Sequence, residues 1–379
     1  MATLLSAEGA GATDATASFL ARHWARPLPP QGEAPAAYSA LERSLDPAAC
    51  GACHPQQYAD WRETWHSRAM GAGVLGQLLD YAPEDREGHQ DCLRCHAPLH
   101  EQVEALIGEL RDGRGAGAHR DGLTCAGCHL RAGRVYGPPR RGSGGDTNAG
   151  PHGGFEAAAA FEDSRFCAAC HQFEADGLAL NGKPLENTWA EWAASRYARD
   201  SVTCQSCHMP DRRHRWRGVH DPETVRGGVT VEAPPPRLAG DVIRATLTLR
   251  NSATGHHLPT YVTPRLVLAI WQEDAVGRSL AGTRREHVVA RQVTPDLSAE
   301  IADTRLAPDA EARLRYAVPR HNEARALVTN IRVEPDAFYV ELYRAWLADG
   351  AGRGTALLRQ ALEAAETSAF DLHRTRSPL

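Results

Sequence analysis

The last third of the chain has the clearest alternation of hydrophobic and polar residues. Ile243, Ala245, Leu247 and Leu249 alternate with Arg244, Thr246, Thr248 and Arg250. This period of two predicts a strand with one buried face. The same period recurs at 312–318 and 329–333, and 264–272 and 287–293 read as further strands. About seven short strands separated by turn residues predict an all-β, Ig-like sandwich over 226–334.

Helical spacing replaces this alternation near the end of the chain. Phe338, Leu342 and Ala345 follow one another at intervals of four and three residues, and so do Leu358, Leu362 and Ala365. This spacing predicts helices near 335–348 and 355–367. We therefore assign 335–379 to C-terminal helices.

Composition changes the picture of the interior. Hydrophobic residues make up 42% of the 379 residues, as in an ordinary globular protein, but aromatic residues make up only 6%. Large side chains alone would fill a core poorly, so we expect something else to occupy volume inside the protein. The net charge of −5 comes without a run of Lys or Arg, which argues against a nucleic-acid partner.

All ten cysteines fall into five Cys-x-x-Cys-His motifs. The motifs are Cys50-Cys53-His54, Cys92-Cys95-His96, Cys125-Cys128-His129, Cys167-Cys170-His171 and Cys204-Cys207-His208. Two cysteines three residues apart can reach the two vinyl groups on one edge of a porphyrin. The histidine that follows then lies beneath the iron as its proximal ligand. The motifs therefore predict five covalently attached haem c groups.

Two other uses of cysteine compete with this interpretation. Cys-x-x-Cys pairs also form zinc sites, and ten cysteines in an exported protein could form five disulfides. Neither requires a histidine directly after the second cysteine. With 18 His in 379 residues, five such coincidences have odds of roughly a few in ten million. The pattern strongly favours haem attachment.

Five haems explain the scarcity of aromatic residues, because the porphyrins would form most of the interior between residues 49 and 208. We expect short helices joined by loops there, with no sheet, and long loops at the glycine-rich stretches 112–118 and 141–154. The predicted fold class is multidomain. An N-terminal extension over 1–48 precedes a mainly helical and irregular multihaem cytochrome c domain over 49–225, and the sandwich and C-terminal helices follow.

The sixth ligand of each iron decides whether a haem only passes electrons or also binds a small molecule. Met1, Met70 and Met209 are the only methionines, and Met209 directly follows a proximal histidine, so methionine ligation is not expected for most haems. Thirteen histidines remain when the five proximal ones are subtracted from eighteen. Ligation of each iron by two histidines is therefore the expectation.

Five histidines are the candidate distal ligands. His66 lies at the edge of a helix predicted over Tyr58–Met70, with Tyr58, Trp61 and Trp65 on one face. The other four are His152 in a Pro-His-Gly-Gly loop, His214 and His220 after the fifth motif, and His256 in a turn after a strand, with His257 as its alternate. We expect the remaining histidines to be plain surface residues: His23, His89, His100, His119, His287, His321 and His373.

The chain resembles the multihaem cytochromes of the cytochrome c-554 family. The resemblance rests on CGACHPQQYADWRETWHSRAM, on CLRCHAP, on CQSCHMP followed by HRWRGVHDP, and on NSATGHHLPT, and it covers roughly 45–340. It implies an exported electron carrier, and it implies that the histidine of W-x-x-[ST]-x-H, here His66, is a distal haem ligand. Related pentahaem nitrite reductases typically bind their catalytic haem through Cys-x-x-Cys-Lys. The only lysine, Lys183, lies far from any cysteine pair, which counts against that chemistry.

Three functions remain open at this stage. The first is electron transfer through a chain of haems between a donor and an acceptor protein. The second is a redox enzyme with one open haem that acts on a nitrogen or sulfur compound. The third is a subunit of an extracellular cytochrome filament, which would make the protein a homo-oligomer. The motifs favour the first, because histidines are plentiful beside them.

Haem is attached to such proteins outside the cytoplasm, so we expect a periplasmic or extracellular protein. The first twenty residues are a poor signal peptide, because no basic residue precedes Arg22 and Glu8 and Asp14 interrupt the apolar run. We expect that a leader has been removed from this sequence. No stretch approaches the ~18–20 apolar residues of a membrane span, so no transmembrane segment is expected.

Overall fold

The computed structural model describes residues 8–113, 117–142, 150–350 and 352–379. The chain folds into two compact units. Unit 1 comprises 1–170, 202–216 and 352–358, and unit 2 comprises 171–201, 217–351 and 359–379. Of the two glycine-rich stretches predicted as loops, 114–116 and 143–149 lie outside the described residues.

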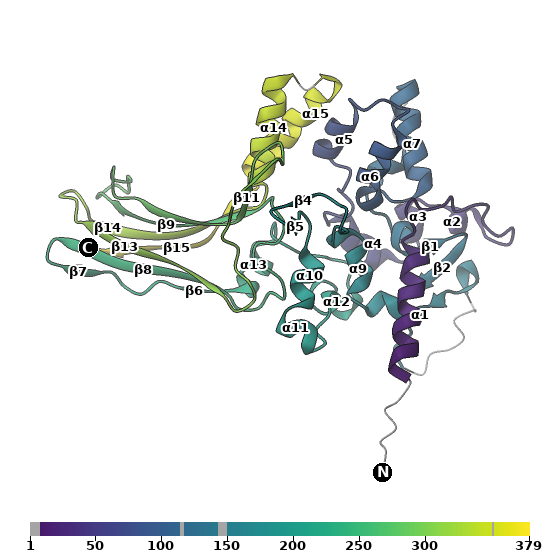
Figure 1. The fold of residues 1–379 in the computed structure, drawn as a ribbon, viewed down its shortest axis with the longest axis horizontal. Helices are drawn as coiled ribbons and strands as arrows, with labels where there is room; N and C mark the ends of the chain where they lie inside the picture. Colours follow the sequence, from purple (N-terminus) through teal and green to yellow (C-terminus); the bar gives the residue numbers. More distant parts are fainter. Residues whose placement is uncertain (1–7, 114–116, 143–149, 351) are drawn as a thin grey trace, which may run out of the picture. The chain divides into compact units, whose positions relative to one another are not determined.

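Unit 1 consists of short helices joined by irregular segments (Figure 1). Its α-helices are α1 (Glu8–His23), α2 (Ala40–Arg43), α3 (Pro47–Gly51), α4 (Pro55–Arg62), α5 (Ala72–Leu78), α6 (Arg86–His96), α7 (His100–Asp112), α8 (Cys125–His129), α9 (Arg165–His171) and α12 (Cys204–His208). Its 3₁₀ turns are η1 (Ala118–Asp121), η2 (Pro151–Gly153), η3 (Ala159–Glu162), η4 (Pro210–Arg212) and η5 (Gly352–Gly354), and its strands are β1 (Leu130–Arg131), β2 (Arg134–Gly137) and β3 (Glu156–Ala157). The helix α9 ends on His171, one residue into unit 2.

A small hydrophobic core holds α5, α6 and α7 together in unit 1. The apolar side chains of α7 recur at Val103, Leu106, Ile107 and Leu110, which is the spacing of one helix face. This face packs with Leu78 and Leu93, both fully buried, in one cluster. Asp85 caps α6 by accepting a hydrogen bond from the backbone N–H of Gly88 at 3.0 Å.

Unit 2 contains the predicted strands, arranged in two four-stranded antiparallel sheets. One has the order β10-β9-β14-β15, and the other has the order β13-β8-β6, with β7 also paired to β8. The strands are β6 (Val229–Glu232), β7 (Arg237–Ala239), β8 (Val242–Asn251), β9 (Arg265–Glu273), β10 (Arg285–Val289), β13 (Glu311–Pro319), β14 (Ala326–Glu334) and β15 (Phe370–Pro378). The hairpin strands are β4 (Ala179–Leu180), β5 (Lys183–Pro184), β11 (Arg291–Val293) and β12 (Glu300–Asp303), and the helices are α10 (Thr188–Ala193), α11 (Arg196–Arg199), α13 (Pro222–Gly228), α14 (Ala337–Asp349) and α15 (Thr355–Thr367). The first residues of α15, up to Leu358, belong to unit 1.

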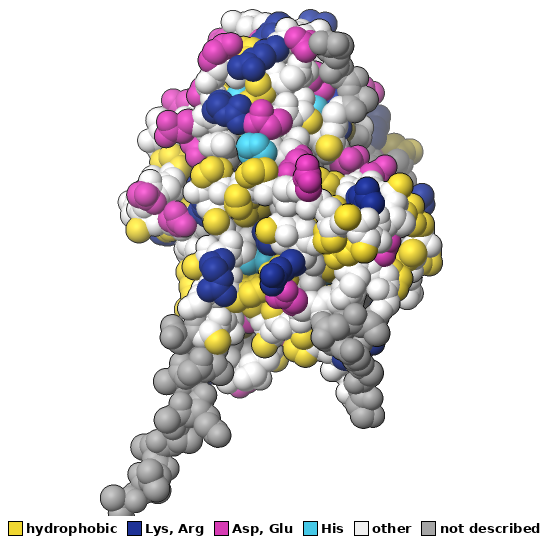
Figure 2. All heavy atoms as spheres, turned by 90° about the vertical axis from the view of Figure 1, so that its right-hand side faces the viewer, with side chains coloured by type: hydrophobic (Ala, Val, Ile, Leu, Met, Phe, Trp, Pro, Cys, Tyr) yellow, Lys and Arg dark blue, Asp and Glu magenta, His cyan; other side chains and the backbone are white. Residues whose placement is uncertain are grey.

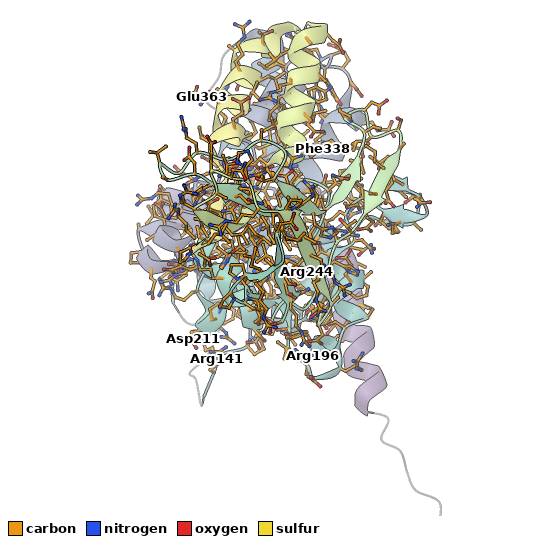
Figure 3. All side chains as sticks on the ribbon, turned by 90° about the vertical axis from the view of Figure 1, so that its left-hand side faces the viewer. Arg141, Arg196, Asp211, Arg244, Phe338 and Glu363 are labelled. Atoms are coloured by element: carbon orange, nitrogen blue, oxygen red, sulfur yellow. The ribbon has the colours of Figure 1, made fainter. Side chains whose placement is uncertain are left out.

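One hydrophobic core is shared by the two larger sheets. Ile243, Leu247 and Leu249 of β8 are fully buried and belong to the same cluster as Leu266 and Leu268 of β9. The alternation seen in the sequence is confirmed in β13, where buried and exposed residues alternate along the strand. The two C-terminal helices are also confirmed, and Figure 3 shows Phe338 on α14 and Glu363 on α15.

Four expectations from the sequence are wrong. Short strands do occur between residues 49 and 208, because β1 to β5 pair locally as small hairpins and a parallel bridge. The helix expected over Tyr58–Met70 ends at Arg62. The chain after α15 is not helical, because β15 pairs with β14 and completes a sheet. His23, His89 and His119, expected at the surface, have at most 3% of their surface exposed.

Candidate haem-binding sites

Each Cys-x-x-Cys-His motif lies on or at the end of a short helix. The third and fifth motifs are the helices α8 and α12 themselves, and the second and fourth end α6 and α9. Thr124 and Thr203 cap α8 and α12 by accepting hydrogen bonds from the N–H groups of Gly127 and Ser206. One helical turn places both sulfurs of a motif on the same side, as attachment to one porphyrin edge requires.

Two proximal histidines are held in a fixed orientation by backbone carbonyls. Nδ1 of His96 lies 2.6 Å from the carbonyl oxygen of Ala69, and Nδ1 of His129 lies 2.7 Å from that of Tyr136. A carbonyl can only accept, so Nδ1 carries the proton and Nε2 is the nitrogen left for a metal. Burial lowers the pKa of both rings, that of His129 to about 4, so both rings are neutral.

The ten cysteines are free, and thiols from different motifs touch one another. Cys50 is hydrogen-bonded to Cys125, Cys95 to Cys170, and Cys167 to Cys204. The hydrogen bond with Cys167 lowers the pKa of Cys204 to about 7, and the same contact raises that of Cys167. Attachment points of the first and third, second and fourth, and fourth and fifth motifs are therefore direct neighbours.

The first and third motifs share a cluster of histidines with aromatic side chains. The ring centroids of His129 and His214 are 6.2 Å apart, and the rings are tilted by 34°. Trp216 lies against both His66, at 4.7 Å, and His214, at 5.1 Å. Nδ1 of His214 lies 3.0 Å from the carbonyl oxygen of Arg212, so His214 also has Nε2 left for a metal. The structure thus brings two of the predicted distal histidines to the third motif.

Local hydrogen bonds explain why the W-x-x-[ST]-x-H segment turns instead of continuing as a helix. Trp61 is buried and donates its indole N–H to the carbonyl of Leu123 at 2.8 Å, while the Thr64 hydroxyl donates to the carbonyl of Trp61 at 2.7 Å. The carbonyl of His66 then accepts the backbone N–H of Leu123 at 2.9 Å. These bonds fix His66 beside the start of the third motif.

Glycine is required at residue 122 for the same contact. Its φ is +65°, and a Cβ at this residue would lie 2.4 Å from the carbonyl oxygen of His66. Real Cβ atoms do not approach so closely, so any other residue would displace the His66 turn.

An ion pair holds His214 in place. Asp60 accepts two hydrogen bonds of 2.6 Å from Arg213 and one of 3.1 Å from the backbone N–H of His214. The Arg213 guanidinium, with the backbone bond, lowers the pKa of Asp60 despite its burial. The carboxylate of Asp60, on the helix α4 that follows the first motif, therefore positions His214, which lies beside the third motif.

The predicted ligand His152 is also anchored in unit 1. Its Nδ1 lies 2.6 Å from the carbonyl oxygen of Gly154, its N–H donates to Glu42 at 2.5 Å, and its carbonyl accepts the Tyr38 hydroxyl at 2.5 Å. It adopts a positive φ of 48°. Three contacts thus hold this histidine in an unusual backbone conformation, and Nδ1 is again the protonated nitrogen.

Unit 2 distinguishes the two adjacent histidines His256 and His257. Nδ1 of His256 lies 2.8 Å from the carbonyl oxygen of His257, whereas Nδ1 of His257 lies 3.4 Å from Glu191, which also accepts the backbone N–H of His257 at 3.2 Å. Arg305 donates to the other oxygen of Glu191 at 2.7 Å. Glu191 and Arg305 each expose 3% of their side chains, so a buried ion pair supports the turn that carries His256.

His220 is arranged differently from the other predicted ligands. Its Nε2 lies 3.1 and 3.0 Å from the two carboxylate oxygens of Asp336, at the start of α14. A carboxylate partner on one ring nitrogen is common for a metal-bound histidine, whose other nitrogen then binds the metal. For His220 that other nitrogen is Nδ1.

Three histidines that sequence reasoning placed at the surface are buried, one of them by a contact far away in the chain. Nε2 of His23 lies 2.8 Å from the carbonyl oxygen of Cys128, and its ring stacks on Phe19. Burial and the charge of Arg131 lower the pKa of His23 to about 3. His89 contacts the carbonyl of Ala82 at 3.0 Å, and His119 contacts Glu109 at 3.1 Å. Their neighbourhood gives no local sequence signal, so their burial could not be anticipated.

The donor set fits haem c. Each motif offers two thiols and one imidazole, and the rings of His96 and His129, held through Nδ1, leave Nε2 for a haem iron. Across the described part of the chain, no three His, Cys, Asp or Glu side chains converge as ligands of a bare metal ion. Within the same residues, no helix is long and apolar enough to cross a membrane.

Comparison with known proteins agrees with this donor set. Residues 49–130 match the sequence model of the family described as cytochrome c554 and c-prime. The fold is similar to that in the crystal structure of a penta-heme cytochrome c552 from Thermochromatium tepidum, with a TM-score of 0.64 and 19% identity, over 89% of this chain and all of that one. No curated protein sequence matches the chain significantly. Residues 49–130 therefore resemble the cytochrome c554 and c-prime family, and the chain shares its fold with a multihaem cytochrome.

Proposed function

We propose that this protein is a pentahaem electron carrier of the periplasm or the cell surface. It carries one haem c at each of its five motifs and passes electrons between a donor protein and an acceptor protein. When bound, each haem supplies an iron that alternates between the ferrous and the ferric state. The chain itself holds the haems close together, orients their axial histidines and excludes water from the sites.

The contacts among cysteines are the observation that carries this proposal. Electron tunnelling falls steeply with distance, so a conducting chain needs neighbouring haems whose edges nearly touch. The thiol pairs Cys50–Cys125, Cys95–Cys170 and Cys167–Cys204 place attachment edges side by side. After a hydrogen bond and burial, the nearby Cys128 also contributes to the raised pKa values of Cys167 and Cys170. These contacts support an order in which the first haem adjoins the third, the third adjoins the fourth, and the fourth adjoins the second and fifth.

The spacing of two histidines supports ligation of the third haem iron from both sides. An imidazole nitrogen binds a metal at about 2.0–2.1 Å and lies about 1.1 Å from its ring centroid, so two axial rings have centroids about 6.3 Å apart. The centroids of His129 and His214 are 6.2 Å apart. We therefore assign His129 as the proximal and His214 as the distal ligand of the same iron.

The other distal ligands in the proposal are His66, His152, His256 and His220. The carbonyl contacts of His152 and His256 through Nδ1 favour coordination through Nε2. His220 would coordinate through Nδ1, with Asp336 on the other nitrogen. His257 serves as a support for the turn, because its contact with Glu191 ties it to the buried ion pair.

The second half of the chain has a structural role in this proposal. We assign the cytochrome domain to 49–225 after an extension over 1–48, an Ig-like sandwich to 226–334 and the C-terminal helices to 335–379. The shared core of the two four-stranded sheets supports the sandwich. Its hairpin β11–β12 and the turn with His256 are linked by the backbone pair Leu258–Leu306, so the sandwich carries one of the proposed ligands.

Spectroscopy of the purified haem-loaded protein tests the proposal. A pyridine haemochrome assay should give five haems per chain, and the ferric protein should show low-spin signals from bis-histidine haems. The ferrous protein should bind no CO. A stoichiometric high-spin signal with CO binding would instead indicate an open haem and a catalytic function. The pair His256→Ala and His257→Ala is a matched test of the assignment in unit 2, because only the first should create a high-spin haem.

A further inference from the structure

A pocket in unit 1 lies behind the second and fourth motifs. It is open to solvent and is lined by residues of three chain segments. Arg94 lies between the two cysteines of the second motif, and Ala169 lies between those of the fourth. The segment 24–28, after α1, forms another wall. The pocket therefore borders two haem attachment helices without using their cysteines or histidines.

Basic groups gather in this pocket. On the face of the molecule seen in Figure 2, acidic and basic side chains intermingle, so a site lined by one sign of charge stands out. Arg26, Arg94 and His100 line the pocket, and Asp and Glu are absent from its lining. The nearest described carboxylate partner of His100 is Glu104, 3.7 Å from its Nε2, and Glu104 also pairs with Arg86. Arg26 donates one N–H to the carbonyl of Ala169 on the pocket wall, and three cationic or protonatable groups thus line a shared space.

A rigid hydrogen-bond donor adds to these charges. Trp24 lines the pocket, and its indole N–H is buried with no hydrogen-bond partner among the described residues. Its ring is fixed by Arg131, whose guanidinium carbon lies 4.9 Å from the ring centroid, and by Phe166 at 5.2 Å. A buried donor without a partner is unfavourable. An acceptor that entered the pocket would remove this penalty.

We propose that this pocket binds a small inorganic oxyanion. The guanidinium groups of Arg26 and Arg94 supply planar donors for the anion oxygens, and the Trp24 N–H supplies a third donor. The surrounding Pro98, Leu28 and Val103 are apolar, which lowers the local dielectric constant and strengthens the attraction. The effect on the haems, stated next, rests on the proposed function. A bound anion would stabilise the ferric state of the second and fourth haems and lower their reduction potentials.

Titration of the haem-loaded protein with sulfate and with nitrite, at constant ionic strength and with chloride as the background ion, tests the binding. We expect saturable binding by calorimetry and a negative shift in the potential of part of the haems. Arg26→Gln and Trp24→Phe should each weaken binding about tenfold or more. The control Arg111→Gln, which removes the same charge from an exposed residue at the end of α7, should leave binding within about twofold.

Two results would overturn the proposal. One is the absence of saturable binding of either anion to the unaltered protein. The other is a crystal structure of the haem-loaded protein in sulfate in which a haem propionate, rather than a free anion, contacts Arg26 and Trp24. Anion binding detected by calorimetry without any shift in haem reduction potential would contradict only the proposed effect on the haems. The low-spin spectrum tests the electron-carrier function separately, because anion binding in the pocket does not depend on how the haem irons are ligated.

Discussion

The buried ion pair beneath His256 allows a quantitative prediction. Removing one partner of a buried pair costs about 3–5 kcal/mol, because the other charge stays buried without compensation. Glu191→Leu leaves Arg305 with Asp303, which accepts hydrogen bonds of 2.9 and 3.0 Å from it. We therefore expect a cost near the lower limit, about 3 kcal/mol. Arg305→Met leaves Glu191 with only the weaker contacts of His257, so about 3–5 kcal/mol is expected.

The double variant Glu191→Leu/Arg305→Met removes both charges together. Apolar residues of similar volume often replace a buried pair at little cost, so the double variant should lose much less than the sum of the two single losses. The expected coupling free energy is about 2 kcal/mol or more. In this double variant Asp303 loses Arg305 but still pairs with Lys183, whose Nζ lies 2.6 Å from its carboxylate. The variant therefore leaves no unpaired carboxylate at Asp303.

Hydrogen exchange on the haem-loaded protein measures these losses locally. Peptides that cover 251–260 and 300–306 report the free energy of opening of the turn and of the strand beside it. The exposed pair Glu311–Arg313, with 42% and 47% of the side chains exposed, supplies a control, and Glu311→Leu should leave these peptides nearly unchanged. A single-variant loss below about 1 kcal/mol, or strictly additive losses, would refute the reasoning.

Three further predictions concern the histidine cluster and acid stability. His214→Ala should convert one of five haems to a high-spin, CO-binding form, and an unchanged spectrum would contradict its pairing with His129. Gly122→Ala should displace the His66 turn and lower the melting temperature, with Gly108→Ala on open helix surface as the control. Glu191 and Asp303 have lowered pKa values: burial alone would raise both, but His257 and Arg305 lower that of Glu191, and Arg305 and Lys183 lower that of Asp303. Their stabilisation of unit 2 should therefore be complete at neutral pH and should be lost as pH falls below about 4, which acid titration followed by circular dichroism would detect.

The regular elements of unit 2 could be predicted because their signal is local. The strands β8 and β13 expose part of one face, so their sequences alternate between apolar and polar residues, whereas β9 and β14 are buried along most of their length. The strand β15 escaped prediction because its segment, FDLHRTRSP, has few apolar residues and pairs with β14 at the edge of the sheet. Edge strands need less hydrophobicity.

The signal for the predicted haem attachment residues is equally local, but the signal for their surroundings is not. The helix over Tyr58–Met70 was predicted from spacing, yet Trp61 donates to Leu123, 62 residues away, and the chain turns after Arg62. Likewise, no feature near His214 reveals Asp60, which positions it from 154 residues away. Haem proteins depend on such distant contacts, since ligand and attachment site belong to different segments.

These histidines fall into two groups according to which ring nitrogen contacts a protein oxygen. His96, His129, His152, His214 and His256 use Nδ1 for a carbonyl. His23, His89 and His220 use Nε2 for a carbonyl or carboxylate. Nδ1 is adjacent to the ring carbon that bears Cβ, so coordination through it brings the backbone close to the porphyrin and crowds the bond.

His220 is the one predicted distal ligand in the second group, so its haem should differ from the rest. Asp336 accepts a hydrogen bond from Nε2–H, which leaves Nδ1, the more crowded nitrogen, as the one that would hold the iron. We expect one haem with a shifted low-spin signal that changes in His220→Ala. Asp336→Asn should alter the same signal alone, because it keeps a hydrogen-bond acceptor but removes the charge. An effect of Asp336→Asn on several haems, or on none, would show that His220 is held by Asp336 for packing rather than for ligation.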